Sequence, residues 1–214
     1  MRIGVCLCGC MLAGCARNFP VAIRDEEIAA FSMLAANLSR AAVPAVICQN
    51  RGFCYIFWSA STYNGQPSPV GPAGMDARCN ADGNKPNTSQ YKALLSGGTR
   101  RATTTANLGD GQLDWVLYAS MTYKRPDGTL IGSTNAAKLL IFPLTNGISP
   151  SAGSGTWTGM NIDWTDNTDI CTGWTSTGGF GTIGTATSTT TGALYQTNAQ
   201  GCGAVIFNIY CVEQ

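Results

Sequence analysis

The sequence has no histidine and few charged residues. None of its 214 residues is His, and charged residues make up 12% of the chain, about half of the share of roughly 25% in ordinary soluble proteins. Histidine is the commonest general base near neutral pH and the commonest metal ligand. Its absence therefore excludes Ser-His-Asp and Cys-His nucleophilic sites, and it also excludes zinc sites ligated by His.

Charges of either sign are also not grouped. Lys and Arg number 13 and Asp and Glu number 12, giving a formal net charge of +1, and the longest run of like charge is Asp25-Glu26-Glu27. This balance is not that of a nucleic-acid-binding surface. Beyond the first residues, the longest strongly apolar run is residues 53–58, whereas a membrane-spanning helix needs about 18 to 20. The 26 Gly, with many Thr, Ser and Asn, indicate a turn-rich β-type protein with a neutral polar surface.

The first fifteen residues resemble the leader of a bacterial lipoprotein. A basic residue at position 2 is followed by an apolar stretch over 3–11, and Leu12-Ala13-Gly14 precedes Cys15. In such a leader, cleavage before Cys15 leaves a residue that carries several acyl chains, which together anchor a protein stably. The alternative is a buried strand or short helix that ends in Cys. The leader is short and contains Cys6, Cys8 and Cys10, and a start codon further upstream would explain its length.

Six cysteines follow the leader: Cys48, Cys54, Cys79, Cys171, Cys202 and Cys211. In an exported protein an even number indicates disulfides. Metal ligation is the competing interpretation, although these six include no Cys-x-x-Cys pair. Cys48 and Cys54 flank a turn-forming stretch, so we expect a local bridge between them.

Loss of residues 1–14 would remove one basic residue and leave a formal side-chain charge of zero.

Residues 15–47 are expected to form a tether followed by an amphipathic helix over 24–40. Acidic residues at 25–27 suit the N-terminal end of a helix dipole, and apolar residues recur at helical spacing up to Leu38. Pro44 is a plausible stop beyond it. This helix would dock on the domain, lie on a membrane surface or pair with a second copy in a stalk.

Residues 48–214 are expected to form one α+β domain. The pattern predicts strands over 55–61, 139–142 and 204–212, helices over 75–81 and 89–95, and a β-hairpin of 115–123 with 129–131. Arg125-Pro126-Asp127-Gly128 supplies the turn of that hairpin. Residues 149–201 are expected to be a long loop region. Within it, 176–191 has nine hydroxyl residues in sixteen, which indicates either a mobile loop or an O-modified segment.

Several blocks in this domain resemble the leptospiral endostatin-like surface lipoproteins. The opening blocks are Cys54-Tyr-Ile-Phe-Trp-Ser-Ala-Ser-Thr-Tyr-Asn-Gly65, Gly74-Met-Asp-Ala-Arg-Cys-Asn-Ala-Asp82 and Tyr91-Lys-Ala-Leu-Leu95. The later blocks are Trp157-Thr-Gly159, Cys171-Thr-Gly-Trp174 and Tyr210-Cys-Val-Glu-Gln214. Their order matches over residues 48–214, which makes the resemblance more specific than any single motif.

The resemblance implies a fold and a disulfide pairing. The fold is a variant of the C-type lectin-like architecture, as in endostatin, with two short helices, antiparallel strands and a long loop region. The implied bridges are Cys79–Cys211 and Cys171–Cys202, and the local Cys48–Cys54 bridge completes the set.

The resemblance also implies a role in attachment. Members of the family bind host extracellular-matrix proteins, and complement regulators are partners of some. Endostatin holds zinc through a histidine cluster that this chain does not have. Sugar-binding C-type lectins hold calcium through Glu-Pro-Asn or Gln-Pro-Asp with Trp-Asn-Asp. Here Gln66-Pro67-Ser68 lacks the carboxylate and Trp164-Thr-Asp-Asn167 has another order, so calcium-dependent sugar binding by that route is not expected.

Two groups of side chains are candidates for ligand binding. Trp157, Trp164 and Trp174 lie in the long loop region and would be either core residues or exposed anchors for a partner. We expect at least two of them to pack internally. Arg100 and Arg101 lie beside a Thr run and would form either a basic patch for sulfated sugars or a solvated loop.

The densest group of oxygen ligands is Asn161, Asp163, Asp166, Asn167 and Asp169. Its spacing is not that of an EF-hand loop. Asn and Asp residues near Gly more often form turns by bonding their own backbone, so we expect turns here and no metal.

The sequence therefore predicts a lipid-anchored, non-enzymatic surface protein of the outer membrane with no cofactor. Its predicted partners are host extracellular-matrix glycoproteins and, in addition, a complement regulator. The alternatives are a carbohydrate-binding module that uses the 149–201 loops and a structural envelope lipoprotein. A glycosidase needs only two carboxyl groups, but no constellation of catalytic residues is visible.

Overall fold

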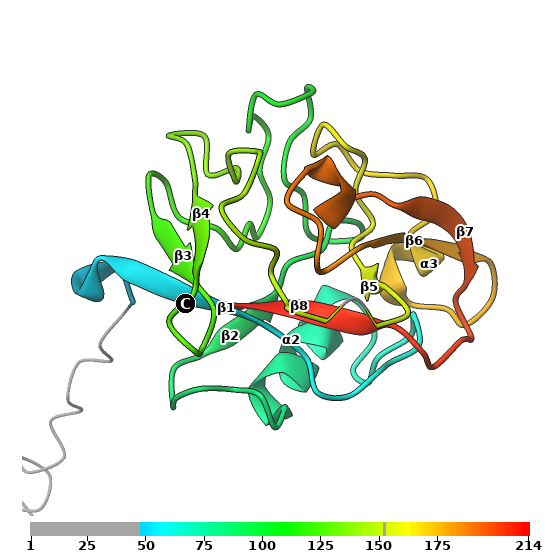
Figure 1. Ribbon diagram of the computed structural model, residues 1–214. Coiled ribbons are helices and arrows are strands. Elements are labelled where there is room, and N and C mark those ends of the chain that lie inside the picture. The colour runs from blue at the N-terminus through cyan, green and yellow to red at the C-terminus, as the bar shows by residue number, and fades with distance from the viewer. Residues whose placement is uncertain (1–47, 152) are drawn as a thin grey trace, which may run out of the picture. The chain divides into compact units, whose positions relative to one another are not determined.

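The computed structural model describes residues 48–151 and 153–214 (Figure 1). The predicted leader, the lipidation site Cys15 and the predicted helix 24–40 lie outside the described residues. Over the described residues the protein is α+β, as predicted, with many strands and few short helices. None of its helices there has the length and apolar character needed to cross a membrane.

The C-terminal strand β8 (Asn208–Glu213) lies in the middle of the sheet (Figure 1). It pairs antiparallel with β1 (Phe53–Trp58), with Phe57 opposite Cys211. Its two ends also pair with two further strands, β5 near Asn208 and β2 near Glu213. Both ends of the domain sequence therefore meet in one pair of central strands.

Eight strands form the sheet, seven of them in the order β4-β3-β1-β8-β5-β6-β7, with β2 paired to β8 off this path. The remaining strands are β2 (Tyr91–Ala93), β3 (Thr122–Lys124), β4 (Leu130–Ser133), β5 (Thr156–Trp157), β6 (Phe180–Gly184) and β7 (Thr197–Gly201). The pairs β1/β3 and β5/β8 are parallel, and the other pairs are antiparallel. The sheet is therefore mixed rather than antiparallel throughout.

The predicted helix 75–81 is present as α2 (Pro72–Ala81), which begins with a Pro in its first turn. The predicted helix 89–95 is wrong, because Tyr91–Ala93 forms strand β2 against β8. Tyr91 and Ala93 are buried and Lys92 is partly exposed, an alternation of period two. Tertiary pairing with a buried strand has overridden the local helical pattern.

The three other helical turns are short. They are η1 (Cys48–Arg51), α3 (Cys171–Trp174) and η2 (Thr191–Ala193). The backbone of Thr172 in α3 has a φ of 55°, in the left-handed region. α3 is therefore a tight turn that reverses the chain rather than a regular helix.

The predicted hairpin is present as β3 and β4, which pair antiparallel, but its first strand covers only Thr122–Lys124 and not the whole of 115–123. Its turn is closed by the bond from Arg125 N to Thr129 O at 2.8 Å, and Gly128 adopts a φ of 88°. That backbone conformation favours glycine. Asp127 Oδ1 accepts a hydrogen bond from Thr129 N at 2.8 Å, which fixes the turn.

Two other expectations from the sequence are wrong. Residues 139–142 are not a strand, since they contribute only an isolated bridge from Leu140 to Thr134. Residues 149–201 are not simply a loop region, because they contain β5, α3, β6 and β7. The segment rich in hydroxyls, 176–191, includes β6, whose Gly181–Gly184 residues are buried. Of these four buried residues only Ile183 has a large apolar side chain, so the strand carries little local hydrophobic signal.

Successive residues of the two central strands face opposite sides of the sheet. Ile56 and Tyr210 belong to one apolar cluster, whereas Phe57, Ile209 and Cys211 belong to the other. All residues of β8 are buried. Covering on both faces explains the nearly continuous apolar run that predicted a buried final strand.

Three disulfides join the described cysteines in the expected pairs. Cys48–Cys54 closes a short loop, Cys79–Cys211 joins α2 to β8, and Cys171–Cys202 joins α3 to the residue after β7. The Cα atoms of the three pairs lie 4.9, 5.5 and 5.6 Å apart, within the usual range for a disulfide. Each bridge ties a helical turn to the sheet or to its edge.

Candidate functional site

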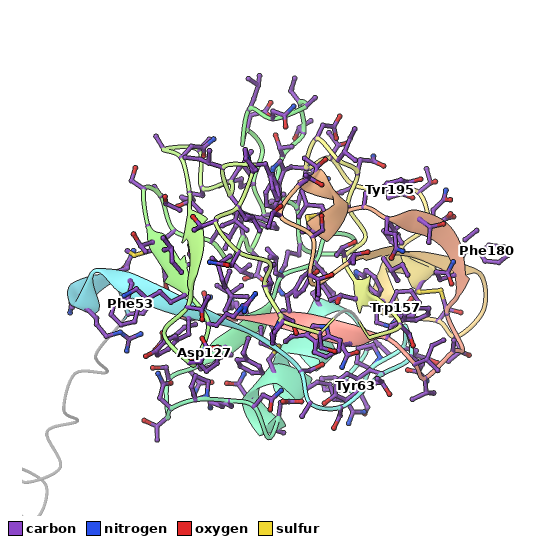
Figure 2. All side chains as sticks on the ribbon, viewed as in Figure 1. Phe53, Tyr63, Asp127, Trp157, Phe180 and Tyr195 are labelled. Atoms are coloured by element: carbon purple, nitrogen blue, oxygen red, sulfur yellow. A yellow bond between two sulfur atoms is a disulfide. The ribbon has the colours of Figure 1, made fainter. Side chains whose placement is uncertain are left out.

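The three tryptophans expected as possible ligand anchors are all internal. Trp157, labelled in Figure 2, packs edge to face against Trp174 with ring centroids 5.8 Å apart, and neither is exposed. Their indole N–H groups donate to the backbone carbonyls of Tyr63 and Ser96, each at 2.9 Å. Trp164 is also buried. A ligand cannot reach these rings in this structure, so their role is packing. The burial of the tryptophans agrees with the expectation that at least two of them pack internally.

Arg100, in contrast, does not lie in a basic patch or a solvated loop, because its side chain is completely buried. It forms a bidentate pair with the carboxylate of Asp76, at 2.8 and 2.7 Å, and also binds Asp114. Its Nη1 further donates to Ala93 O at 2.8 Å. Burial by itself lowers the pKa of the Arg100 guanidinium, but the two carboxylates more than offset this and raise that pKa. Arg100 therefore holds α2, β2 and residue 114 together.

Arg101 lies at the surface and is only partly exposed. Its Nε contacts Asp166 Oδ2 at 3.4 Å, and both side chains remain about one-third exposed. A basic patch of Arg100 with Arg101 does not form, since one guanidinium is buried and the other faces a carboxylate.

The oxygen-rich segment 161–169 forms turns, as expected. Asp163 Oδ1 accepts from Thr165 N at 3.1 Å, and Asn167 Oδ1 accepts from Asp169 N at 2.9 Å. Asn161 Oδ1 accepts from Asn167 Nδ2 at 2.6 Å. Within residues 48–151 and 153–214, no group of three Cys, Asp or Glu side chains is arranged to hold a metal ion.

Glu213 is buried at the end of β8 and is not placed for acid–base chemistry on a ligand. Its carboxylate forms an ion pair with Arg51 and accepts from Tyr55 N at 3.0 Å. Its other oxygen accepts from Asn87 Nδ2 at 2.8 Å and Ser89 Oγ at 2.9 Å. A buried charge with this many partners stabilises the fold, and removing one partner would leave the charge uncompensated.

Three loops are tied together at the end of the domain opposite α2, at the top of Figure 1, and comprise residues 101–114, 135–142 and 160–168. Asn107 N donates to Asp163 O at 2.9 Å. Gln112 Nε2 donates to Ala137 O, also at 2.9 Å. The first loop is therefore bonded to both of the others.

The ring of Trp164 supports these loops from within. It packs edge to face against Trp115, with ring centroids 6.0 Å apart, and lies 5.9 Å from the ring of Phe142. Trp115 Nε1 donates to Lys138 O at 2.9 Å. Trp115, which directly follows the first loop, thus joins residues of the second and third loops in one aromatic group, and this packing restrains the loops.

Asp110 fixes the first loop internally. Its Oδ1 accepts from Thr105 N at 2.7 Å and Thr103 Oγ1 at 2.8 Å, and its Oδ2 accepts from Thr105 Oγ1 at 2.9 Å. These bonds, that from Thr105 N foremost, lower the pKa of Asp110 to about 2. The carboxylate is therefore ionised at neutral pH and holds the loop in one shape.

The same three loops expose large aliphatic side chains, which we call the loop-end surface: Leu108, Leu113, Ile141 and Ile162. Leu108 is 62% exposed and Ile162 is 56% exposed. Exposed aliphatic side chains on restrained loops can be buried by a partner without a large cost in loop ordering. The loop-end surface is therefore suited to contact with another protein.

A groove of about 310 Å³ opens elsewhere, between the β3–β4 turn and residues 148–151. Its apolar lining is Phe57, Trp58, Pro126, Ile148 and Pro150. Trp58 comes from the end of β1, and its Nε1 donates to Thr156 Oγ1 at 2.8 Å. That bond holds the indole ring in place at the groove.

Polar side chains also line this groove: Asn84, Arg125, Asp127, Ser149 and Ser151. Asn84 Nδ2 donates to Trp58 O at 2.9 Å, and Arg125 Nε donates to Gly147 O at 2.8 Å. Asp127, labelled in Figure 2, belongs to the β3–β4 turn. Its bond from Thr129 N, with the nearby charge of Arg125, lowers the pKa of Asp127, which is ionised at neutral pH.

Neither surface was identified from the sequence. The groove draws Trp58, Asn84, Arg125 and Ser149 from four separate segments, so no local motif marks it. The sequence contains a weak indication of the loop-end surface. Leu108 stands alone among Thr, Asn and Gly residues, and an isolated aliphatic side chain in a turn-rich segment is a reason to ask what covers it.

A model of a protein family matches residues 60–191, and the family is described as "Protein of unknown function (DUF1554)". This match covers more than half of the chain. No curated protein matches the sequence significantly.

We predict that Arg100 and Arg101 contribute very differently to stability. Arg100→Met should lower the free energy of unfolding by about 3–5 kcal/mol, because it leaves Asp76 partly buried without its counter-charge. Arg101→Met removes an exposed pair and should cost less than about 1 kcal/mol. Urea unfolding followed by tryptophan fluorescence measures both. Equal small losses would contradict a structural role for Arg100.

Proposed function

Because the chain belongs to the DUF1554 family, whose function is unknown, we propose a function from its surface. The protein is a lipid-anchored outer-membrane protein, exposed at the cell surface, that binds host extracellular-matrix glycoproteins through the loop-end surface. It has no catalytic role, and a complement regulator is a further partner. The observation that carries this proposal is the set of exposed aliphatic side chains on three loops that are bonded to one another.

The composition of the loops supports protein binding rather than binding of a charged ligand. Leu108 and Ile162 come from loops joined by the Asn107–Asp163 hydrogen bond, so they are held on the same end of the domain. Arg101, the basic residue on the first of these loops that the sequence had suggested for sulfated sugars, already faces Asp166. Aliphatic anchors surrounded by hydroxyl and amide groups are typical of the apolar centre and polar rim of an interface.

Other observations support the proposed C-type lectin-like fold and the proposed export of the protein from the cytoplasm. In β1 and β8 the two ends of the domain sequence pair with each other, which accords with the endostatin-like architecture that the resemblance implies. Three disulfides and a low content of charge suit a protein outside the cytoplasm. The resemblance of the first fifteen residues to a lipoprotein leader that ends at Cys15 supports the lipid anchor.

Binding to immobilised fibronectin and laminin tests the proposed function. We predict that the double substitution Leu108→Ser with Ile162→Ser weakens binding at least about tenfold, since exposed apolar anchors contribute most of the energy of such interfaces. Surface plasmon resonance with the full chain gives the dissociation constants. Both residues are more than half exposed, so the substitutions should leave the melting temperature unchanged.

The matched control is Val205→Ser with Ile206→Ser. These two residues are 58% and 50% exposed but lie between β7 and β8, outside the three loops. The control should bind as the unaltered chain does. Equal binding by the two double variants, or no binding to either matrix protein by the unaltered chain, would refute the proposed function.

The anchor is tested by metabolic labelling with palmitate in a bacterial host. Cys15→Ser should abolish the label and release the protein from the membrane fraction, because no acyl chain then holds it. Cys10→Ser, a change of the same kind within the leader, should keep the label. A labelled Cys15→Ser variant would show that the anchor lies elsewhere, and an unaltered chain without label would show that there is no acyl anchor.

A further inference from the structure

We propose that the groove beside Trp58 is a glycan-binding site that holds one pyranose ring of a neutral sugar. This site lies outside the loop-end surface and stands independently of matrix binding. Its volume of about 310 Å³ is at the lower end of the range of roughly 300–1,000 Å³ for small-molecule sites. The groove therefore suits a single ring rather than a larger ligand.

The apolar part of the groove suits the C–H face of a sugar ring. Trp58 is fixed by its bond to Thr156. Gly153 lies against the same indole, since a Cβ atom at that position would stand 2.6 Å from the ring. The hydrogen bond and the close backbone restrain the ring, and Pro126 and Pro150 add apolar surface to the same groove. A pyranose buries one C–H face on such a platform and keeps its hydroxyls at the edge.

The polar part of the groove offers both acceptors and donors. The Nδ2 of Asn84 donates a hydrogen bond to Trp58 O, and its Oδ1 remains available as an acceptor. Asp127 Oδ1 accepts from Thr129 N, and the carboxylate is exposed and can accept further hydrogen bonds. Arg125 directs Nε and Nη2 at Gly147 O, which leaves Nη1 as a donor. Ser149 Oγ accepts from Ser151 N at 3.0 Å and retains its proton for donation.

This combination favours vicinal hydroxyls over the other ligands of an aromatic groove. A proline-rich peptide presents carbonyl acceptors and few N–H donors, so Asn84 Oδ1 and Asp127 Oδ2 would be desolvated without partners. A sulfated or acidic sugar would meet the carboxylate of Asp127, and Arg125 only balances that charge. A neutral hydroxyl both donates and accepts, and adjacent hydroxyls can satisfy Asp127 and Asn84 together with Arg125.

The test is saturation-transfer NMR on the purified full-length chain. The probes are the methyl glycosides of glucose, galactose, mannose and N-acetylglucosamine, together with methyl glucuronide and nonaproline. We expect transfer to at least one neutral glycoside, strongest at its ring C–H protons, and weaker transfer to the glucuronide. Asp127→Asn should raise the dissociation constant of that glycoside roughly tenfold or more, since it removes a charged acceptor.

The matched control is Asp163→Asn. Asp163 accepts from the N–H two residues ahead, as Asp127 does, but it lies away from the groove. Asp163→Asn and the Leu108→Ser, Ile162→Ser variant should both bind the glycoside normally. Transfer to none of the four neutral glycosides, binding of nonaproline alone, or equal effects of Asp127→Asn and Asp163→Asn would each overturn the proposal.

Discussion

The antiparallel pairing of β1 with β8 is the interaction on which the rest of the domain depends. It joins the first and last strands of a segment of more than 150 residues, and β8 also pairs with β2 and β5. The Cys79–Cys211 bridge fastens this strand to α2 and closes a loop with a sequence separation of 132. In the chain-entropy model such a bridge stabilises a fold by roughly 5 kcal/mol, against roughly 2 kcal/mol for the six-residue separation of Cys48 and Cys54.

The central pair places the groove directly, whereas the loop-end surface is positioned by other contacts. Trp58 is the last residue of β1, opposite Tyr210 of β8, and it forms part of the groove. Arg100 joins the end of the first loop, at Asp114, to Asp76 of α2. The other two loops are held through their hydrogen bonds to the first loop. A strand holds Trp58 in the groove and hydrogen bonds hold the three loops to one another, and both arrangements reduce the conformational entropy lost on binding.

Parts of this fold can be predicted from local sequence patterns, but neither the groove nor the loop-end surface can. The β3–β4 turn has Pro126 and Gly128 where a turn needs them, and the apolar run in β8 predicts a buried strand. The local pattern of residues 89–95 predicts a helix, but Tyr91–Ala93 forms a strand because it pairs with β8, more than one hundred residues away. From the sequence alone, Arg100 could be a solvated residue, because the fold brings its partners Asp76 and Asp114 to it from separate segments. The sequence favoured internal packing for at least two of the three tryptophans, and all three are buried. It does not show what covers them: a Cβ atom on Gly181 of β6 would stand 2.5 Å from the ring of Trp157, a contact that no local pattern indicates.

Native-state hydrogen exchange of the full chain tests the central role of β8 most directly. If the domain depends on the β1–β8 pair, the amides of Ile209–Val212 exchange only through global unfolding, with the same opening free energy as those of β1. They should then be protected far more than the amides of 104–112 in the loop-end region. Exchange of the β8 amides at the rate of that loop, with β6 still protected, would contradict the account.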